Sequence, residues 1–385
     1  MSQPAPFSTP KPLTIKQHFR TLKDPRRRHR RLHRLLDIVV IALCGVLCGA
    51  DDWQEIATFG QGRYAWLKRF LALPNGIPSH DTFERVFERL DPQAFQACFR
   101  SWIAALSIHL KMPHIAIDGK TLCHSGTADL GPLHVVSAWA TAQHLVLGQE
   151  AVAEKSNEIT AIPRLLELLD LSGALVTIDA MGCQKEIAEQ IVKRQGDYLL
   201  TVKGNQPTLL ADIQEVFNDL LDRPTRELQR LETHERGHGR IESRDYYLVA
   251  LPRGFRKRHA DWRELRSLGM VLTQRQVGAQ EPTYEARFFI SSLKPDVRRF
   301  AQAVRQHWGI ENSLHWHLDI TFREDASRIG QRHAAENFAL LRRQALGLLK
   351  RHPDKKSVKC KRLAAALDMA FLEEILQGAG TLENL

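Results

Sequence analysis

The sequence predicts an α/β protein with a mixed-sheet core, a helical N-terminal domain and an inserted, mainly β subdomain. Three observations support this prediction. Apolar residues recur at helical spacing up to about residue 110, short apolar strands alternate with amphipathic helices after that, and β-rich stretches follow residue 206. The chain has 385 residues, of which 43% are hydrophobic, so it can bury the cores of two or three domains.

The N-terminal segment, residues 11 to about 110, has the pattern of several helices and no strand-like alternation. Its apolar run at 38–50 is about 13 residues long, short of the roughly 20 needed to span a bilayer, so we expect a buried helix and no membrane contact. Asp81 and Glu84 predict a capping box at the start of a later helix. The first residues carry no export signal and the six cysteines are scattered, which favours reduced thiols and a cytoplasmic protein.

The central segment opens with three apolar runs within 114–153, which predict an antiparallel meander. A helix capped by Ser156 or Asn157 follows, then a strand at 173–180, a second helix and a strand at 197–206. The order β-β-β-α-β-α-β implies a mixed sheet covered by helices.

Residues 206–293 interrupt this order with a helix and three β-rich stretches, and the pattern is helical again from 295. The predicted domains are therefore a helical segment at 1–112, a core made of 113–205 and 294–350, a β-rich insertion at 206–293 and a helical tail at 351–385.

Positive charge is concentrated in two runs. The chain has a net charge of +10; residues 20–34 alone carry eight Arg and Lys against one Asp, and residues 350–362 carry seven against one. Such clusters are expected of a protein that neutralises nucleic-acid phosphates. The alternative is a solvated basic face without a specific partner.

Two aspartates, Asp118 and Asp179, each stand at the end of a predicted apolar strand and precede a small residue. Either one alone is explained as a turn former or helix cap. If their strands are neighbours in the sheet, however, both carboxylates meet at one edge. Oxygen ligands gathered in this way are typical of sites for hard divalent cations.

The stretch "HWGIENSLHW", residues 307–316, places His307, Glu311 and His315 at i, i+4 and i+8 of a predicted helix. Zinc bound by these three side chains is one interpretation, but a catalytic zinc site usually draws a third ligand from another element. The favoured interpretation is that Glu311 projects from a helix packed on the sheet, while Trp308 and Trp316 pack.

The sequence "HERGH", residues 234–238, has the H-E-x-x-H form of a zinc-protease helix. Gly237 and the following Gly239 disfavour a helix there. We therefore interpret it as a charged turn.

Nine phrases occur in one order along nearly the whole chain: "GIPSHDTFERVF", "AIDGKTL", "HVVSAW", "EKSNEITAIP", "TIDAMGCQ", "DYLLTVKGNQ", "GHGRIE", "HWGIENSLHWHLD" and "AAENFALLR". With these phrases the chain resembles the DDE transposases of bacterial insertion sequences, of the H-repeat-associated type. The resemblance implies an RNase H-like core, a helical N-terminal domain and an insertion before the last catalytic helix. It also implies that Asp118, Asp179 and Glu311 are the catalytic, metal-binding acids.

The implied activity is DNA cleavage at transposon ends followed by strand transfer into target DNA. Two Mg²⁺ ions, for which Mn²⁺ can substitute, would clamp the scissile phosphate about 3.5 to 4 Å apart. The implied partners are inverted-repeat DNA at the transposon ends, target DNA and a second copy of the chain in a homodimer. The expected location is the bacterial cytoplasm, at the nucleoid.

Several side chains are candidate DNA contacts. The N-terminal basic run is assigned to transposon-end DNA, and polar residues that follow the core strands are candidates for holding phosphates. The candidates are Arg26, Arg27, Arg28, Arg30, Arg31, Lys120, Lys203, Asn205 and His307. Glu158, a further acid, is expected to serve the first turn of its helix.

The chain departs from the resembling family around the last acid. Related transposases have Tyr, Arg and Lys where this sequence has Val304, His307 and Leu318, and Cys123 stands where Arg is expected. His307, or Arg305 beside it, is a candidate for taking over the phosphate contact.

Two other functions fit the same residues. One is an RNase H-fold DNA nuclease that does not transfer strands, and the other is a domesticated, non-catalytic DNA-binding protein. A strand-transfer assay separates the first from a transposase, and intact acids are unnecessary for the second.

Overall fold

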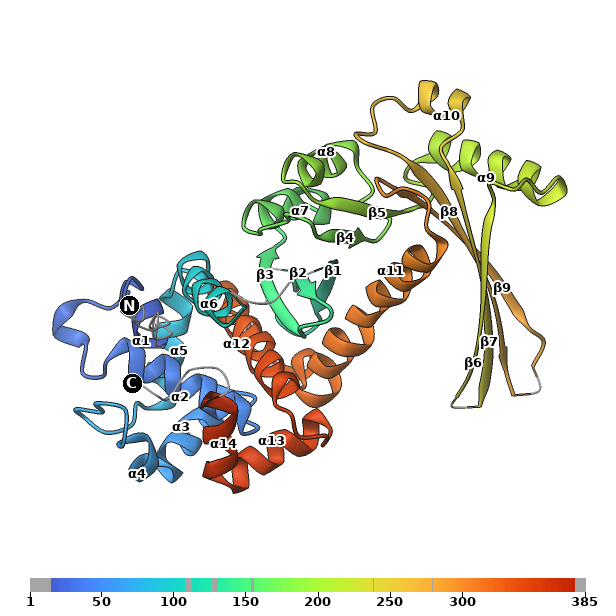
Figure 1. The fold of residues 1–385 in the computed structure, drawn as a ribbon. Coiled ribbons are helices and arrows are strands. Elements are labelled where there is room, and N and C mark those ends of the chain that lie inside the picture. Colours follow the sequence, from blue (N-terminus) through green and yellow to red (C-terminus); the bar gives the residue numbers. More distant parts are fainter. Residues whose placement is uncertain are drawn as a thin grey trace, which may run out of the picture. The chain divides into compact units, whose positions relative to one another are not determined.

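The computed structural model describes residues 15–107, 113–126, 131–153, 156–237, 239–278 and 280–377 (Figure 1). By its internal contacts the chain divides into two compact units. One is helical and combines residues 1–111, 122–133 and 316–385, and the other is an α/β unit made of 112–121 and 134–315. The four functional domains predicted from the sequence stay predictions.

Helices from both ends of the chain build the helical unit. The buried α2 confirms the expectation for the apolar run, since every residue from Asp37 to Leu47 is buried. The long α12 is also mostly buried and contacts α2, α5 and α6. The elements are α1 Ile15–His18, η1 Arg28–Arg30, α2 Leu35–Leu47, α3 Trp53–Gly62, α4 Tyr64–Leu67, α5 His80–Arg89, α6 Pro92–Ser107, η3 His317–Thr321, η4 Glu324–Ala326, α12 Arg332–Arg351, α13 Val358–Leu367 and α14 Met369–Gln377.

The predicted capping box is wrong. Helix α5 begins at His80, with Ser79 as its N-cap residue, so Asp81 lies inside the first turn. There it pairs with Arg85 at 3.2 Å. A carboxylate in this position is stabilised by the helix dipole without serving as a cap.

The α/β unit contains the strands and helices in the predicted order. Strand order in the first part of the sheet is β3-β2-β1-β4-β5, with β1, β4 and β5 parallel and β2 antiparallel to β3, which confirms a mixed sheet. The elements are β1 His114–Leu122, β2 Leu133–Ala140, β3 Leu145–Ala151, α7 Glu158–Glu167, β4 Leu175–Ile178, α8 Lys185–Lys193, β5 Asp197–Val202 and α9 Pro207–Asp222.

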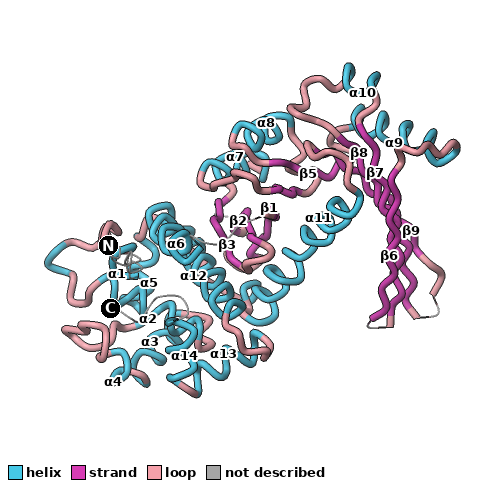
Figure 2. Tube along the Cα trace, viewed as in Figure 1, coloured by secondary structure: helices cyan, strands magenta, loops and turns pink. Residues whose placement is uncertain are grey.

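The inserted segment is mainly β, as predicted, and its strands extend the core sheet. Strand β9 pairs antiparallel with β5, and β8, β7 and β6 follow, so one nine-stranded sheet results (Figure 2). The remaining elements of this unit are β6 Gln229–Gly237, β7 Arg240–Ala250, α10 Arg253–Arg258, β8 Ser267–Val277, β9 Thr283–Ser291, α11 Val297–Ile310 and η2 Glu311–His315.

Strand β6 was missed, and with it the structure of "HERGH". Residues 234–237 belong to β6 rather than to a turn, and His238 lies outside the described residues. His234 contacts Ser243 on β7 at 2.7 Å through Nδ1. Because β6 is an edge strand in which no residue is buried, its sequence is mostly polar on both faces and lacks the alternation that marks a strand.

Helices cover both faces of the sheet. One core cluster joins α7, α8 and α9 to the sheet, and a second joins Phe300 and Val304 of α11 to Leu175, Leu199 and Phe289 on the other face (Figure 1). The site described next lies where α11 ends on this second face. No helix in the described part of the chain is both long and apolar enough to cross a bilayer, and none of the six cysteines, which all lie among the described residues, is in a disulfide.

Candidate metal centre

Asp118 and Asp179 lie on neighbouring parallel strands. The register pairs Ile117 of β1 with Ile178 of β4, so the residues that follow them are also adjacent. Asp179 comes directly after β4, as predicted. Asp118 is not at a strand end, however, because β1 continues to Leu122.

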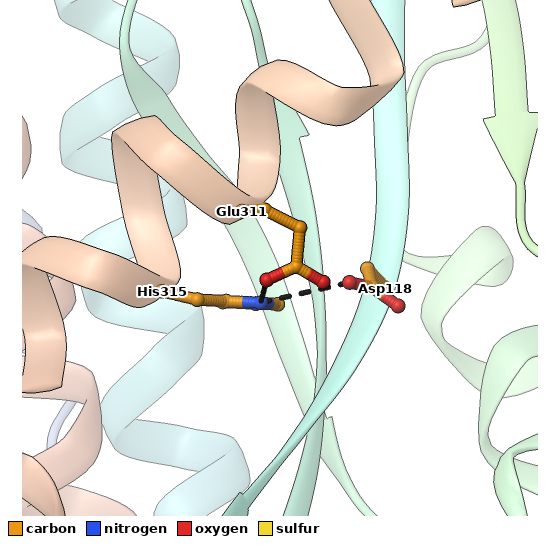
Figure 3. A group of neighbouring side chains, drawn as sticks. All are labelled: Asp118, Glu311 and His315. Carbon is orange, nitrogen blue, oxygen red and sulfur yellow. Dashed lines mark hydrogen bonds and ion pairs between the residues drawn. The ribbon is translucent and has the colours of Figure 1, made fainter. Parts of the chain in front are cut away.

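Glu311 reaches Asp118 from the C-terminal end of α11, where the helix widens into the π-helical turn η2. His315 of the same turn has its Nδ1 3.3 Å from Glu311 Oε2 and 3.5 Å from Asp118 Oδ2 (Figure 3). One donor atom from each of the three side chains lies within 4.8 Å of the others. Widened turns of this kind are frequent at functional sites.

Burial and neighbouring groups shift the pKa values of the three acids. Burial, followed by the charge of Glu311, raises the pKa of Asp118, and burial, followed by Glu158, raises the pKa of Asp179. A hydrogen bond from His315 lowers the pKa of Glu311. Two carboxylates and an imidazole gathered in this way form a donor set that fits a divalent cation.

Asp179 also stabilises a turn, which was the alternative role considered for it from the sequence. Its Oδ1 accepts hydrogen bonds from the backbone N–H groups of Met181 and Gly182, at 3.0 and 3.4 Å. Helix α8 starts only at Lys185, so Asp179 does not cap it. Asp179 is outside the three-residue donor group but acts on the pKa of Asp118.

Glu158 lies in the first turn of α7, as expected, and Asn157 caps this helix, as one of the two predicted alternatives. The sequence interpretation missed that the Glu158 side chain also approaches the acid site. The Glu158 carboxylate lies 2.7 Å from His134 Nε2. A Cβ atom at Gly119 would be 2.1 Å from Glu158 Oε1, so any larger residue would force the Glu158 side chain to move from its place over β1. A glycine directly after Asp118 was the signal that another group approaches there.

The polar residues after the core strands have different environments. Asn205 donates a 2.7 Å hydrogen bond to the Ala180 carbonyl and so supports the turn after Asp179. Lys203 is exposed and its charge acts to lower the pKa of Asp179. Lys120 is buried, with Nζ 3.5 Å from the Thr121 carbonyl oxygen.

His307 faces the sheet. Its Nδ1 is 2.9 Å from Thr177 Oγ1, and that hydroxyl is 3.1 Å from His114 Nε2. Burial lowers the pKa of His307 to about 4, so the ring is neutral at pH 7. A neutral imidazole that contacts a sheet hydroxyl is suited to packing and offers no positive charge to a phosphate.

The basic runs are partly structural. Arg26 is buried, forms a double hydrogen bond to Asp24 and donates to the His33 carbonyl, whereas Arg27, Arg28 and Arg30 are exposed. Arg31 is exposed as a residue but donates to the carbonyl groups of Arg26 and Asp24.

In the second basic run, two of the seven basic side chains are buried. Lys361 donates to the carbonyl groups of Leu349 and His352 at 2.9 and 2.8 Å. Arg362 donates to the Val46 carbonyl and pairs with Asp51 at 3.1 Å. These two residues hold α13 in place by hydrogen bonds, and their buried charges are not available to bind a partner.

A mixed sheet in the order β3-β2-β1-β4-β5, with one acid on β1, one directly after the neighbouring β4 and one at the end of a later helix, defines an RNase H-like α/β protein. Residues 16–103 match a family model described as DDE_Tnp_1-associated, and residues 109–348 match one described as Transposase DDE domain.

Relatives match over nearly their whole length. "H repeat-associated putative transposase YhhI" of Escherichia coli K12 is 38% identical, over 95% of this chain and 98% of that protein. "Putative transposase YncI" of Escherichia coli O157:H7 is 40% identical, over 96% of each. A solved piggyBac transposase synaptic complex with hairpin DNA covers 97% of this chain and 79% of that chain, with 11% identity and a TM-score of 0.40. The chain belongs to the DDE transposase family, in its H-repeat-associated group. The use of divalent metal ions is a property of this family.

Proposed function

We propose that this chain is a DNA transposase that cleaves transposon ends and transfers them into target DNA, with Mg²⁺ as its metal and Mn²⁺ as a substitute. Asp118, Asp179 and Glu311 are the proposed catalytic and metal-binding acids. The observation that supports this most is the convergence of Asp118 and Glu311, far apart in sequence, to within 4.8 Å with His315, while Asp179 directly follows the strand that pairs with that of Asp118.

The residues of the chain have separable tasks in this proposal. Asp118, Asp179 and Glu311 would hold two cations, which when bound activate the attacking oxygen and stabilise the leaving 3′ oxygen. His315 holds the Glu311 carboxylate toward Asp118 by its hydrogen bond. Glu158, itself held by His134, adds a fourth negative charge beside Asp179. The rigid strands β1 and β4 keep these groups at fixed separation.

DNA is the proposed partner of the basic surface. Arg27, Arg28 and Arg30 are exposed and are proposed to contact transposon-end DNA, within an N-terminal domain at 1–112 that binds it. A homodimer would bring two ends together.

Replacement of one acid tests the proposal. The substrate is a plasmid that carries the gene with its flanking DNA, and the variant is Asp118→Asn. We expect Mg²⁺-dependent cleavage to be abolished while DNA binding, measured by fluorescence anisotropy, is retained. Asp222→Asn, an exposed acid at the end of α9, is the control and should cleave normally. Cleavage retained in Asp118→Asn would overturn the site.

A second assay separates a transposase from a nuclease. A labelled, pre-cleaved end with a free 3′-OH is incubated with target plasmid and Mg²⁺. Covalent joining of the label to the plasmid is expected from the wild-type chain. Cleavage without joining would favour the nuclease, and binding without either reaction would favour the domesticated DNA-binding protein.

A further inference from the structure

A second site lies beside the acids, on the same face of the sheet. A pocket of about 410 Å³ is lined by residues of β6 to β9 together with α11 and η2. We call it the arginine pocket, because Arg240, Arg244, Arg275, Arg287 and Arg305 line it. Nothing in the catalytic proposal uses these side chains.

The register of the sheet explains why arginines meet there. Alternate residues of β7 share one face, and near its C-terminal end Tyr246 and Leu248 pack in the core cluster that contains Phe300 and Val304 of α11. Arg244 lies on the same face of β7, two residues before Tyr246, and Trp308 lies one turn after Val304 on α11. The contact between α11 and β7 is therefore apolar at Val304 and Tyr246 and includes a charged side chain at Trp308 and Arg244.

Trp308 contacts two of the arginines that line the pocket. The guanidinium carbons of Arg244 and Arg287 lie 5.1 and 4.5 Å from the centre of its ring. Arg244 is only 2% exposed and is held further by Glu242 at 2.6 Å and Glu235 at 3.2 Å. Cation–π contacts and buried ion pairs fix the guanidinium planes, so little entropy is lost when they bind a ligand.

The pocket keeps a positive charge. Three glutamates line it against the five arginines, and they pair with Arg244, Arg287 and Arg305. Arg240 and Arg275 are exposed, and within the described residues neither has a carboxylate closer than 4 Å. Two unneutralised guanidinium groups beside fixed ones form a site for an anion with several oxygens, such as a phosphodiester.

The pocket lies close to the acids along α11 and η2. Trp308 precedes Glu311 by three residues and Asn312 lines the pocket. Three residues of helix rise about 4.5 Å. One nucleotide of a DNA strand rises about 3.4 Å, so the pocket lies about one to three nucleotides from the acids.

We propose that the arginine pocket binds the sugar–phosphate backbone of the strand that is being cut, one to three nucleotides from the scissile phosphate, through Arg240 and Arg275. This inference rests on the proposed function, because it takes DNA as the substrate. It assigns to the β6–β9 part of the sheet the task of fixing the strand relative to Glu311.

The first test compares two double variants. Arg240→Gln with Arg275→Gln removes the two unneutralised charges, and Arg253→Gln with Arg256→Gln removes two exposed charges of α10 as a control. The probe is a fluorescein-labelled duplex of the plasmid's mapped cleavage site, bound without metal. We expect the pocket variant to lose about tenfold or more in affinity near 0.15 M salt and its salt slope to fall by about two. The control should stay within about twofold, and melting temperatures show whether each variant folds.

The second test locates the contact. Uncharged methylphosphonate linkages replace the three phosphates beside the cut in the probe. The wild-type chain should bind this probe more weakly than the unmodified probe. The pocket variant should bind both probes with nearly the same affinity, because the variant and the modified probe each remove the same interaction. Equal losses in both proteins, or a pocket variant that binds unmodified probe like the wild type, would overturn the inference.

The outcomes separate the inference from the proposed function. A wild-type chain that neither binds nor cleaves the plasmid DNA overturns the proposed function and the inference with it. A wild-type chain that cleaves, with a pocket variant of unchanged affinity, overturns the inference alone. A pocket variant that loses dimerisation but not DNA affinity also overturns it, since the pocket would then bind a second copy of the chain.

Discussion

Replacing Gly119 by alanine should destabilise the chain, although such a change in a strand usually has the opposite effect. Glycine in a strand interior costs about 0.5 to 1 kcal/mol relative to alanine because it loses more backbone entropy on folding. Gly119 has no left-handed backbone conformation that would make alanine unfavourable. On backbone grounds alone, Gly119→Ala would therefore stabilise.

The neighbours of Gly119 reverse this expectation. A Cβ atom would lie 2.1 Å from Glu158 Oε1 and 2.4 Å from His134 Nε2, and these two atoms form a 2.7 Å hydrogen bond with each other. The pair must separate to admit the methyl group. A hydrogen bond to a charged group contributes about 1.5 to 3 kcal/mol. After the backbone gain is subtracted, we expect a net loss of about 0.5 to 2.5 kcal/mol.

Urea unfolding followed by circular dichroism measures this loss. Gly237→Ala is the control, because Gly237 is also a strand glycine and nothing lies within 4 Å of an added Cβ. It should be neutral or slightly stabilising. In a chain with His134→Ala and Glu158→Ala, Gly119→Ala should no longer destabilise. An equal loss in that background, or no loss in the wild type, would refute the reasoning.

Three further predictions concern the acid site and the helical core. His315→Gln should weaken Mn²⁺ binding at least about tenfold in an electron paramagnetic resonance titration, since it removes the group that orients Glu311; unchanged affinity would contradict this. Because the pKa of Asp118 is raised, its contribution favours folding at low pH and is lost as pH rises through the raised value. Asp118→Asn should therefore raise the melting temperature in chelator at pH 8 and change it little near pH 4; the same gain at both pH values would count against the shift. Glu324→Gln should cost about 3 to 5 kcal/mol of unfolding free energy, because the fully buried Arg343 loses its 2.7 Å ion pair; a melting curve like that of the wild type would argue against it.

The order of elements in the core could be predicted from the sequence because each strand is buried on at least one face. Strand β4 is buried at all four positions and reads as a short apolar run between turn residues. The pairing of β5 with β9 could not be read in this way. It joins residues about ninety positions apart, such as Leu199 and Ser291, and nothing local specifies that contact.

The acids were recognisable individually, but their environment was not. Asp118 and Asp179 follow apolar runs, which marks them in the sequence. The placement of Glu158 beside them depends on the packing of α7 over β1, which a helix-start pattern does not reveal. Charge counts likewise overstated the exposed basic surface, because Arg26, Lys361 and Arg362 are buried and donate hydrogen bonds to backbone carbonyl groups.

The antiparallel pairing of β5 with β9 has a consequence for synthesis on the ribosome. When β5 emerges, the strand that covers its open edge has yet to be translated. The nascent chain must therefore keep an unpaired apolar edge protected from other chains until the whole β6–β9 meander has been made. Glu311 is made after that, so assembly of the acid cluster comes late in folding. A truncated chain that ends before β9 should aggregate rather than accumulate as a folded fragment.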